Sequence, residues 1–528
     1  MPKKISGKSV DGAQQNFEQV LDFLAQLFPS CMIEKRVANT DADSVDTADT
    51  ADSEDKSALV RDIDWQVLGN MIGKTLNCEE NESLRREPFG FCWAGKQEAA
   101  REATRPISMA LRPCPEVSKD WDHTGNLYLE GDNLQALKLL QGSYLGKVKM
   151  IYIDPPYNTG KDTFGYVDDF AQSSEEFAKA YLLDEETGAR LVSCKAGSGR
   201  YHSQWCSMMY SRLQVARSLL HRDGVIFISI DDYEAHHLRA ICDEVFGEYN
   251  FIAQLVWQRT TAPKNDAKYI SNSHEYILMY ARELNSFTIG RLPLTKDILE
   301  SYKNPNNDPR GPWKPDNFSV KTRNVSYVYP ITTPTGQQVY PPEGRAWLVS
   351  EEGYQEYLAD DRIYFAKDGD GSVFVKRFLF ERKREGLTPT SLLLLAKDME
   401  TNADAAKSLK DLMKASVFTG PKPVSLLRHL LTLANLDPHG GDIVLDFFSG
   451  SATTAEAVMR ANAEDGGNRR FILVQLPEPC EEDGTAAAAG FKNLCEVGKA
   501  RIRAVAKDIA SSFDCTKIVH GGGYEGFR

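Results

Sequence analysis

The sequence predicts an α/β fold with a doubly wound, mostly parallel sheet. Short apolar runs alternate with helical segments from about residue 120 to 280, and the alternation returns at residue 443. Strands joined through helices run parallel, and their crossover helices cover both faces of the sheet. Between these stretches lies a region rich in Asn, Pro, Lys and aromatic residues without such alternation. We therefore expect one sheet, built from two chain segments around an inserted domain.

Each element follows from a local pattern. In chain order we expect strands at 126–132, 147–154, 225–230, 251–257, 275–280, 443–448 and 471–476, and helices at 133–141, 208–221 and 453–462. Ligands of such sheets bind beyond the carboxyl ends of the strands. Asp132, Asp154 and Asp231 each end or follow a predicted strand, so we expect them to gather on one rim.

The chain divides into four predicted parts. Residues 1–100 form a small helical region, since apolar residues recur at helical spacing between Phe17 and Phe28. Within it, residues 39–56 hold seven acids against one base, typical of a flexible linker or an exposed acidic loop. Residues 101–284 and 416–528 form the two halves of the sheet domain. Residues 285–415 form the inserted domain.

Composition limits the class of protein. With 528 residues, 42% of them hydrophobic, the chain can hold several domains, and no apolar run approaches the length that spans a bilayer. The ten cysteines form no CxxC pair and no secretory signal follows Met1, so we expect a cytoplasmic protein with reduced thiols and no membrane. The net charge of −13 argues against binding nucleic acid by charge alone. Residues 255–420 are nearly balanced, however, with 23 basic and 21 acidic residues, which leaves room for a local DNA-binding face.

The tetrapeptide from Asp154 to Tyr157 carries the strongest chemical signal. It ends an apolar run and places a carboxylate, two prolines and an aromatic ring at the edge of the sheet. The Asp154 carboxylate and the Pro155 carbonyl can both accept hydrogen bonds beside the flat ring of Tyr157. This arrangement suits an exocyclic amino group on a heterocycle, and it predicts amino-group methylation of a nucleobase.

A second motif follows the strand that begins at residue 443. Asp446 to Thr454 reads as a strand end, a turn of small residues and a helix start. Small residues let a ligand approach the backbone, and helix N–H groups favour its negative end. The position two residues after Gly450 is Ala452, so the three-glycine fingerprint of a dinucleotide site is absent.

Together these motifs resemble the β class of DNA adenine-N6 methyltransferases. In that class the catalytic motif precedes the S-adenosylmethionine motif in circularly permuted order, and a target-recognition domain lies between them. Residues 131–138 and 151–160 resemble more closely the modification subunits of Type III restriction–modification systems. The resemblance covers about residues 90 to 285 and 416 to 510.

The resemblance implies roles for individual residues. Asp154 and the Pro155 carbonyl would hold the adenine amino group, and Tyr157 would stack on a base flipped out of the duplex. Pro156 belongs to the same catalytic motif. The residues implied to bind the cofactor are Asp132, Lys422, Asp446, Phe448, Ser449, Gly450, Thr453, Gln475 and Glu478. For the ribose hydroxyls, Gln475 and Glu478 remain alternatives. For Asp132, capping of the following helix is an equally good interpretation.

Other charged groups carry less information. The basic residues Lys376, Arg377, Arg382, Lys383 and Arg384 are candidates for phosphate contacts, although such runs are more often solvated. The histidines, including the pair at 236 and 237, show no metal-binding spacing, so we expect no metal site.

The function predicted from this resemblance is site-specific methylation of adenine N6 in double-stranded DNA. A cytosine-N4 methyltransferase and a non-catalytic DNA-specificity module remain alternatives. The expected partners are a second copy of the chain and a restriction helicase–nuclease subunit. Residues 522–528 resemble a strand entry that continues further in Type III subunits, so the chain would be a shortened stand-alone enzyme or a truncated product.

Overall fold

The computed structural model describes residues 32–37, 58–63, 90–159, 199–263, 268–321, 324–366, 372–394 and 399–512. These residues belong to two compact units. One contains Gly290–Pro389, and the other contains the rest of the chain. The predicted helix between Phe17 and Phe28, the acidic stretch at 39–56 and the motif at 522–528 lie outside the described residues.

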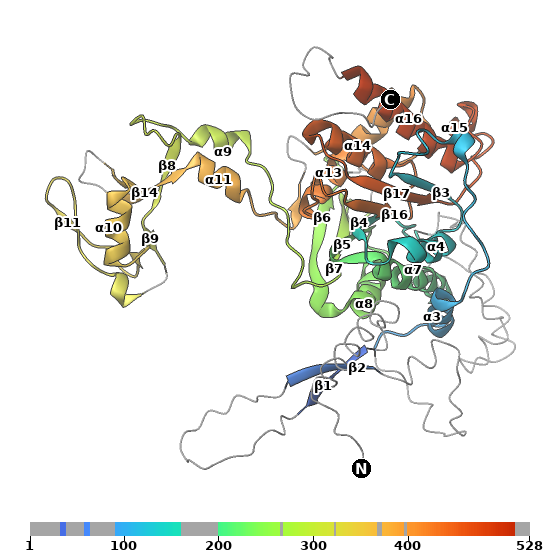
Figure 1. Cartoon of the computed structure of the whole chain (residues 1–528), viewed down its shortest axis with the longest axis horizontal. Helices are drawn as coiled ribbons and strands as arrows, with labels where there is room; N and C mark the ends of the chain where they lie inside the picture. The colour runs from blue at the N-terminus through green and yellow to red at the C-terminus, as the bar shows by residue number, and fades with distance from the viewer. Residues whose placement is uncertain are drawn as a thin grey trace, which may run out of the picture. The chain divides into compact units, whose positions relative to one another are not determined.

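The larger unit is built on an eight-stranded sheet of order β15-β6-β7-β5-β4-β16-β17-β3 (Figure 1). Its strands are β3 (Leu127–Glu130), β4 (Val148–Ile153), β5 (Leu220–Ile230), β6 (Phe251–Gln258), β7 (His274–Ala281), β15 (Leu392–Leu393), β16 (Ile443–Asp446) and β17 (Arg470–Gln475). All neighbouring pairs are parallel except those of β7, which runs antiparallel to β5 and β6. The predicted doubly wound, mostly parallel sheet is therefore confirmed.

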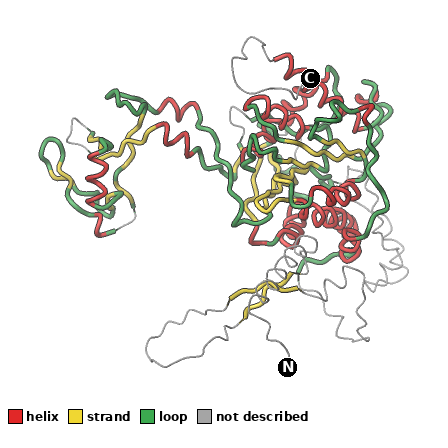
Figure 2. The backbone as a smooth tube through the Cα atoms, viewed as in Figure 1, coloured by secondary structure: helices red, strands yellow, loops and turns green. Residues whose placement is uncertain are grey.

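Helices cover both faces of this sheet (Figures 1 and 2). The helices of the larger unit are α3 (Lys96–Thr104), α4 (Asn133–Tyr144), α7 (Gly199–Leu219), α8 (Ala235–Phe246), α12 (Asn402–Met413), α13 (Val424–Leu433), α14 (Thr453–Asp465), α15 (Thr485–Ala488) and α16 (Leu494–Ser512). Figure 1 shows α4, α7 and α8 on one face and α13, α14 and α16 on the other. The strands β4 and β16 are buried on both faces, as their unbroken apolar runs predict. This burial fixes the strand register, and so it fixes where the residues after each strand lie.

The second unit has its own small core, around Phe318 and Trp347. It contains α9 (Lys296–Ser301), β8 (Trp313–Asn317), β9 (Ser319–Val320), β10 (Ile331–Thr332), β11 (Gln338–Val339), β12 (Ala346–Trp347), α10 (Glu351–Ala359), β13 (Ile363–Phe365), β14 (Val373–Phe378) and α11 (Leu379–Glu385). Its strands pair only with one another among the described residues. Such independence is the usual sign of an inserted domain.

Two boundaries differ from the sequence-based division. The unit runs from 290 to 389, whereas we predicted 285–415. Residues 390–415 join the larger unit because β15 extends its sheet beside β6, and because Leu409 on α12 shares a cluster with Val497 on α16. Near the N-terminus, β1 (Met32–Val37) and β2 (Ala58–Ile63) form an antiparallel pair where we predicted only helix and linker. Among the described residues, no helix is both long and apolar enough to cross a bilayer.

Candidate active site

The predicted catalytic tetrapeptide leaves the carboxyl end of β4, near the middle of the sheet. Asp154 follows β4 directly, and Asp446 ends the neighbouring strand β16. Asp132 follows β3 and Asp231 follows β5, both parallel to these strands. The four acids therefore lie along one rim of the sheet, as predicted.

A lysine holds the catalytic tetrapeptide. The Lys422 ammonium donates to the Tyr157 hydroxyl at 2.7 Å and lies 3.2 Å from Oδ1 of Asp154. The Tyr157 hydroxyl donates in turn to the same Oδ1 at 2.8 Å. Lys422 directly precedes Pro423, the N-cap of α13, so the start of that helix fixes its position. We expected Lys422 near the cofactor, and the structure places it against the catalytic residues.

Glu275 completes this cluster, and the sequence analysis missed it. Its Oε2 accepts from Lys422 at 2.8 Å and lies 3.2 Å from the Tyr157 hydroxyl, while Arg259 lies 3.5 Å from Oε1. Glu275 is the second residue of β7, and the antiparallel course of β7 brings it to the carboxyl ends of the parallel strands. An acid inside an otherwise apolar strand was the available sequence signal.

The charges in this cluster are interdependent. Desolvation raises the pKa of Asp154, and Lys422 partly counters that rise. Burial alone would lower the pKa of Lys422, but Asp154 and Glu275 raise it above its usual value. The lysine therefore stays protonated, and one ammonium serves both the buried Glu275 and the partly exposed Asp154.

The acceptors needed for an amino group have no hydrogen-bond partner among the described residues. Among the described residues, no group bonds Oδ2 of Asp154 or the carbonyl of Pro155. The Pro156 carbonyl is occupied, since it accepts from the indole N–H of Trp205 at 2.7 Å. Of the two prolines, Pro155 is thus the one free to accept, as the sequence analysis predicted.

Hydrogen bonds fix the turn after β16, and we call its residues Asp446, Phe448 and Gly450 the cradle. Oδ1 of Asp446 accepts from the Phe448 N–H at 3.1 Å, and Oδ2 accepts from the Thr454 hydroxyl at 2.5 Å. The Gly450 N–H donates to the side-chain oxygen of Gln475 at 2.7 Å. Burial raises the pKa of Asp446 from 3.8 to about 7. A cationic ligand here would favour the ionised form of this carboxyl.

Gly450 cannot readily be replaced in this turn. Its φ is +48°, and a Cβ added there would lie 3.3 Å from the ring of Phe418. Ala452, the position at which a three-glycine fingerprint would place glycine, also has a left-handed backbone with φ +64° and caps α14. Its methyl group is fully buried, so it packs inside the protein. The departure to alanine is accommodated at the cost of backbone strain.

Two of the expected cofactor residues are committed to protein contacts. The Thr453 hydroxyl accepts from the Arg501 guanidinium at 2.7 Å. Asp132 caps α4 through the Gln135 N–H at 3.0 Å and also pairs with Arg212 at 3.0 Å. The structure therefore supports the interpretation of Asp132 as a helix cap. Thr453 stabilises the turn after β16 through its bond to Arg501.

The residue after Asp132 links the two motifs. The Asn133 amide donates to the Phe447 carbonyl at 2.8 Å, while its oxygen accepts from Arg212. All three residues are completely buried. The Gly-Asp-Asn motif at 131–133 follows β3, which lies two strands from β16 in the sheet. Through Asn133 it stabilises the turn after β16.

For the ribose hydroxyls, the structure favours Glu478 over Gln475. The Gln475 amide is occupied by the Gly450 N–H and the Leu476 carbonyl. The Glu478 carboxylate is half-buried, and none of the described residues bonds it. Burial raises its pKa. A carboxylate with open acceptors suits a pair of hydroxyl donors. Cradle and carboxylate together fit the cofactor that the sequence implies.

Comparison with known proteins identifies the family. A DNA methylase family model matches residues 148–480, which span both motifs. The chain is 39% identical over 429 residues to the Type III restriction–modification enzyme StyLTI Mod subunit of Salmonella typhimurium, covering 80% of this chain and 63% of that one. It is 32% identical over 481 residues to the EcoPI Mod subunit of Escherichia phage P1, covering 83% and 72%.

The chain belongs to the DNA methylase family. Within that family it groups with the modification subunits of Type III restriction–modification systems. The chain spans just under two thirds of the StyLTI subunit's length. Among solved structures, the M1.HpyAVI–SAM complex is similar with a TM-score of 0.29 and 13% identity, over 71% of this chain and 98% of that one.

In this member of the family, the predicted basic cluster divides. Lys376 is buried, with its ammonium 2.7 Å from Asp361 and 3.4 Å from Asp308, so it belongs to the interior of the inserted unit. A buried, doubly paired ammonium is unsuited to a phosphate. Arg377, Arg382, Lys383 and Arg384 are at least partly exposed. The DNA-contact proposal is therefore limited to these four residues.

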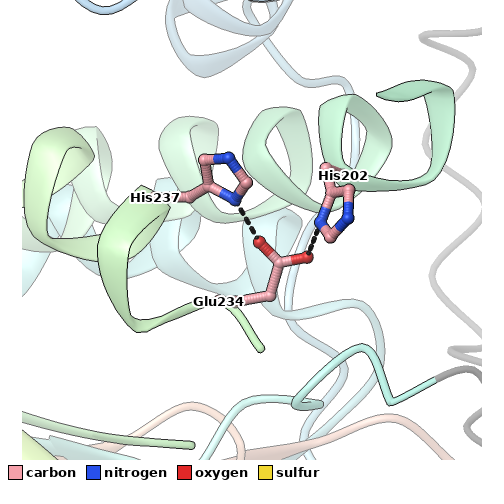
Figure 3. A group of neighbouring side chains, drawn as sticks. All are labelled: His202, Glu234 and His237. Carbon is pink, nitrogen blue, oxygen red and sulfur yellow. Dashed lines mark hydrogen bonds and ion pairs between the residues drawn. The ribbon is translucent and has the colours of Figure 1, made fainter. Parts of the chain in front are cut away.

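The structure also brings together a group that sequence spacing had hidden. His202 on α7 and His237 on α8 both approach the buried carboxylate of Glu234, within reach of one metal ion (Figure 3). We predicted no metal site because these residues are far apart in the sequence. The packing of α7 against α8 makes them neighbours, and their role is considered below.

Proposed function

We propose that this methylase transfers a methyl group to the N6 amino group of adenine at a specific site in double-stranded DNA. The observation that supports this most strongly is the pair of open acceptors, Asp154 Oδ2 and the Pro155 carbonyl, beside the Tyr157 ring. An amino group presents two N–H donors, and this pair can accept both. The residues act on a base that has left the duplex.

The methyl donor is S-adenosylmethionine, which when bound supplies a methyl group on a positively charged sulfur. The cradle of Asp446, Phe448 and Gly450 would hold its methionine part, and Glu478 its ribose. Asp446 ends β16, Phe448 and Gly450 follow it, and Glu478 follows β17. The strand β16 is the neighbour of β4, and β17 lies beside β16. Both sites thus open on one rim.

The chain's residues act by positioning. Asp154 and the Pro155 carbonyl hold the amino hydrogens and direct the nitrogen lone pair towards the methyl group. Lys422 and Glu275 keep Asp154 and Tyr157 in place through contacts of 2.7–3.2 Å. Bound S-adenosylmethionine would supply the methyl group and leave as the neutral thioether, and the proton that the amino nitrogen gives up would pass to the partly exposed Asp154 carboxylate and on to solvent. No enzyme nucleophile takes part, so orientation and electrostatics supply the rate enhancement.

The biological setting follows from the relatives. We propose that this chain methylates host DNA in the cytoplasm, as a homodimer and with a restriction helicase–nuclease subunit. The inserted unit at 290–389 would recognise the target sequence, with Arg377, Arg382, Lys383 and Arg384 contacting phosphates. Phosphate contacts of this kind weaken as salt concentration rises.

Transfer of labelled methyl groups to plasmid DNA tests the assignment. Wild-type protein should label DNA, and Asp154→Ala should reduce labelling by at least a hundredfold because the amino group loses its main acceptor. Asp223→Asn is the matched control, since Asp223 also pairs with a lysine, Lys149 on β4, at 2.7 Å. This variant should retain its activity. Equal activity in wild type and Asp154→Ala would refute the assignment.

A further inference from the structure

The residues on both sides of Tyr157, Pro156 and Asn158, are hydrogen-bonded to buried side chains outside the catalytic loop at 154–158. On one side, the Trp205 indole donates to the Pro156 carbonyl at 2.7 Å. On the other side, the Asn158 amide donates to Oε1 of Glu234 at 2.5 Å. Trp205 and Glu234 are completely buried, and Asn158 almost completely. The pose of Tyr157 thus depends on two anchors that lie outside the catalytic tetrapeptide.

Glu234 is the centre of the second anchor. Nδ1 of His202 lies 2.5 Å from its Oε1, and Nδ1 of His237 lies 2.7 Å from its Oε2 (Figure 3). With Asn158, this gives three polar contacts to one buried carboxylate. Among the described residues, no lysine or arginine bonds Glu234. The two imidazoles therefore satisfy a carboxylate to which no described lysine or arginine is bonded.

Asn158 needs such an anchor because its backbone is strained. Its φ is +60°, a left-handed conformation that asparagine tolerates better than most residues but still at a cost. The chain turns here, directly after Tyr157. A contact that holds the Asn158 side chain stabilises this turn, and the turn sets the direction in which Tyr157 and Asp154 point.

The distances favour hydrogen bonding over metal coordination. Two ligands on one tetrahedral zinc, each about 2.0 Å from the ion, lie about 3.3 Å apart. The histidine nitrogens lie 2.5 and 2.7 Å from the Glu234 oxygens, which are hydrogen-bond separations. Oε1 also accepts from Asn158. The carboxylate is satisfied by these N–H donors.

We propose that Glu234, held by His202 and His237, is a positioning residue for methyl transfer, acting through Asn158. This cluster fixes the turn after Tyr157, while Trp205 fixes the residue before it. The proposal rests on the catalytic role proposed for Asp154 and Tyr157. None of the cluster residues needs to touch substrate or cofactor.

Steady-state kinetics of Glu234→Gln tests the proposal. The glutamine keeps the shape but replaces one acceptor with an NH₂ group, so at least one donor of the cluster loses its partner. We expect kcat to fall by about ten- to a hundredfold, because small displacements of reacting groups have effects of this size. The KM for DNA and the dissociation constant for S-adenosylmethionine should stay within about twofold.

A double-mutant cycle separates positioning from general destabilisation. Asn158→Ala should lower kcat about as much as Glu234→Gln, and the double variant should be little worse than either single variant. Glu244→Gln is the matched control. Glu244 also lies on α8 and bonds across to Tyr210 on α7 at 2.6 Å, but it does not contact the catalytic loop. This control should reduce thermal stability and leave kcat unchanged.

Three results would overturn the proposal. The first is an unchanged kcat in Glu234→Gln. The second is a double variant whose loss of kcat equals the product of the losses in Glu234→Gln and Asn158→Ala. The third is stoichiometric zinc in purified wild-type protein that is absent from His202→Asn and whose removal abolishes activity, which would make the cluster a metal centre. Failure of the proposed function would look different, because wild-type protein itself would then not label DNA.

Discussion

At the scale of single residues, the cluster of Asp154, Tyr157, Lys422 and Glu275 shows what the sequence could and could not predict. Asp154 and Tyr157 are adjacent to a strand end, so a local pattern located them. Glu275 and Lys422 come from a distant strand and a distant helix. Their convergence depends on the antiparallel course of β7, which no local periodicity encodes.

The same limit explains the two corrections at this scale. Lys376 belongs to a run of basic residues, but its burial beside Asp308 is set by the packing of the inserted unit. His202 and His237 meet only because α7 packs on α8. Runs of charged residues and the spacing of histidines describe only residues that are close in the sequence. Long-range ion pairs depend on tertiary packing.

The buried carboxyl of Asp446 gives a pH prediction for the protein without cofactor. Its pKa is raised from 3.8 to about 7 in the folded protein, so between these values the folded state binds a proton that the unfolded chain has lost. The contribution of Asp446 to the free energy of unfolding therefore falls as pH rises through this window, by up to about 1.4 kcal/mol per pH unit. Asp446→Asn removes this contribution.

Urea unfolding of wild type and Asp446→Asn at pH 5, 6 and 7 measures the effect. Wild type should lose stability relative to the variant as the pH rises. A constant difference between the two proteins across this range would contradict the shifted pKa.

At the scale of elements, the sequence predicted most of the strands and their ends. The strands β3, β4, β6, β7, β16 and β17 lie within two residues of the predicted bounds at each end. The strand β16 ends two residues earlier than predicted because Phe447 begins the turn. The short strand β15 was not predicted, since two residues carry no period. Its pairing with β6 is a tertiary effect.

The cap of α14 allows a test of backbone strain. Ala452→Gly should raise the free energy of unfolding by about 0.5–1 kcal/mol, since relief of the left-handed strain outweighs the added entropy of the unfolded chain. Ala455→Gly, inside the same helix and equally buried, should lower it by about 1 kcal/mol or more. Chemical denaturation checks both. Destabilisation of equal size in the two variants would mean that Ala452 is not strained.

At the scale of the whole molecule, the order of the parts was the informative feature. The catalytic strand precedes the cofactor strand in the sequence, yet β4 and β16 are neighbours in the sheet. The compact unit at 290–389 lies in the sequence between them. The sequence predicted this organisation because the βα alternation stops and restarts. The boundary at 389 could not be predicted, since residues 390–415 join the larger unit through contacts distant in sequence.

The central claim, methylation of adenine N6 in DNA, is tested most directly by nucleoside analysis of the product. Plasmid DNA would be incubated with the protein and S-adenosylmethionine, digested to nucleosides and examined by mass spectrometry. The account predicts N6-methyladenine, absent from reactions with Asp154→Ala. N4-methylcytosine in its place, or no methylated base from protein that binds the cofactor, would contradict the account.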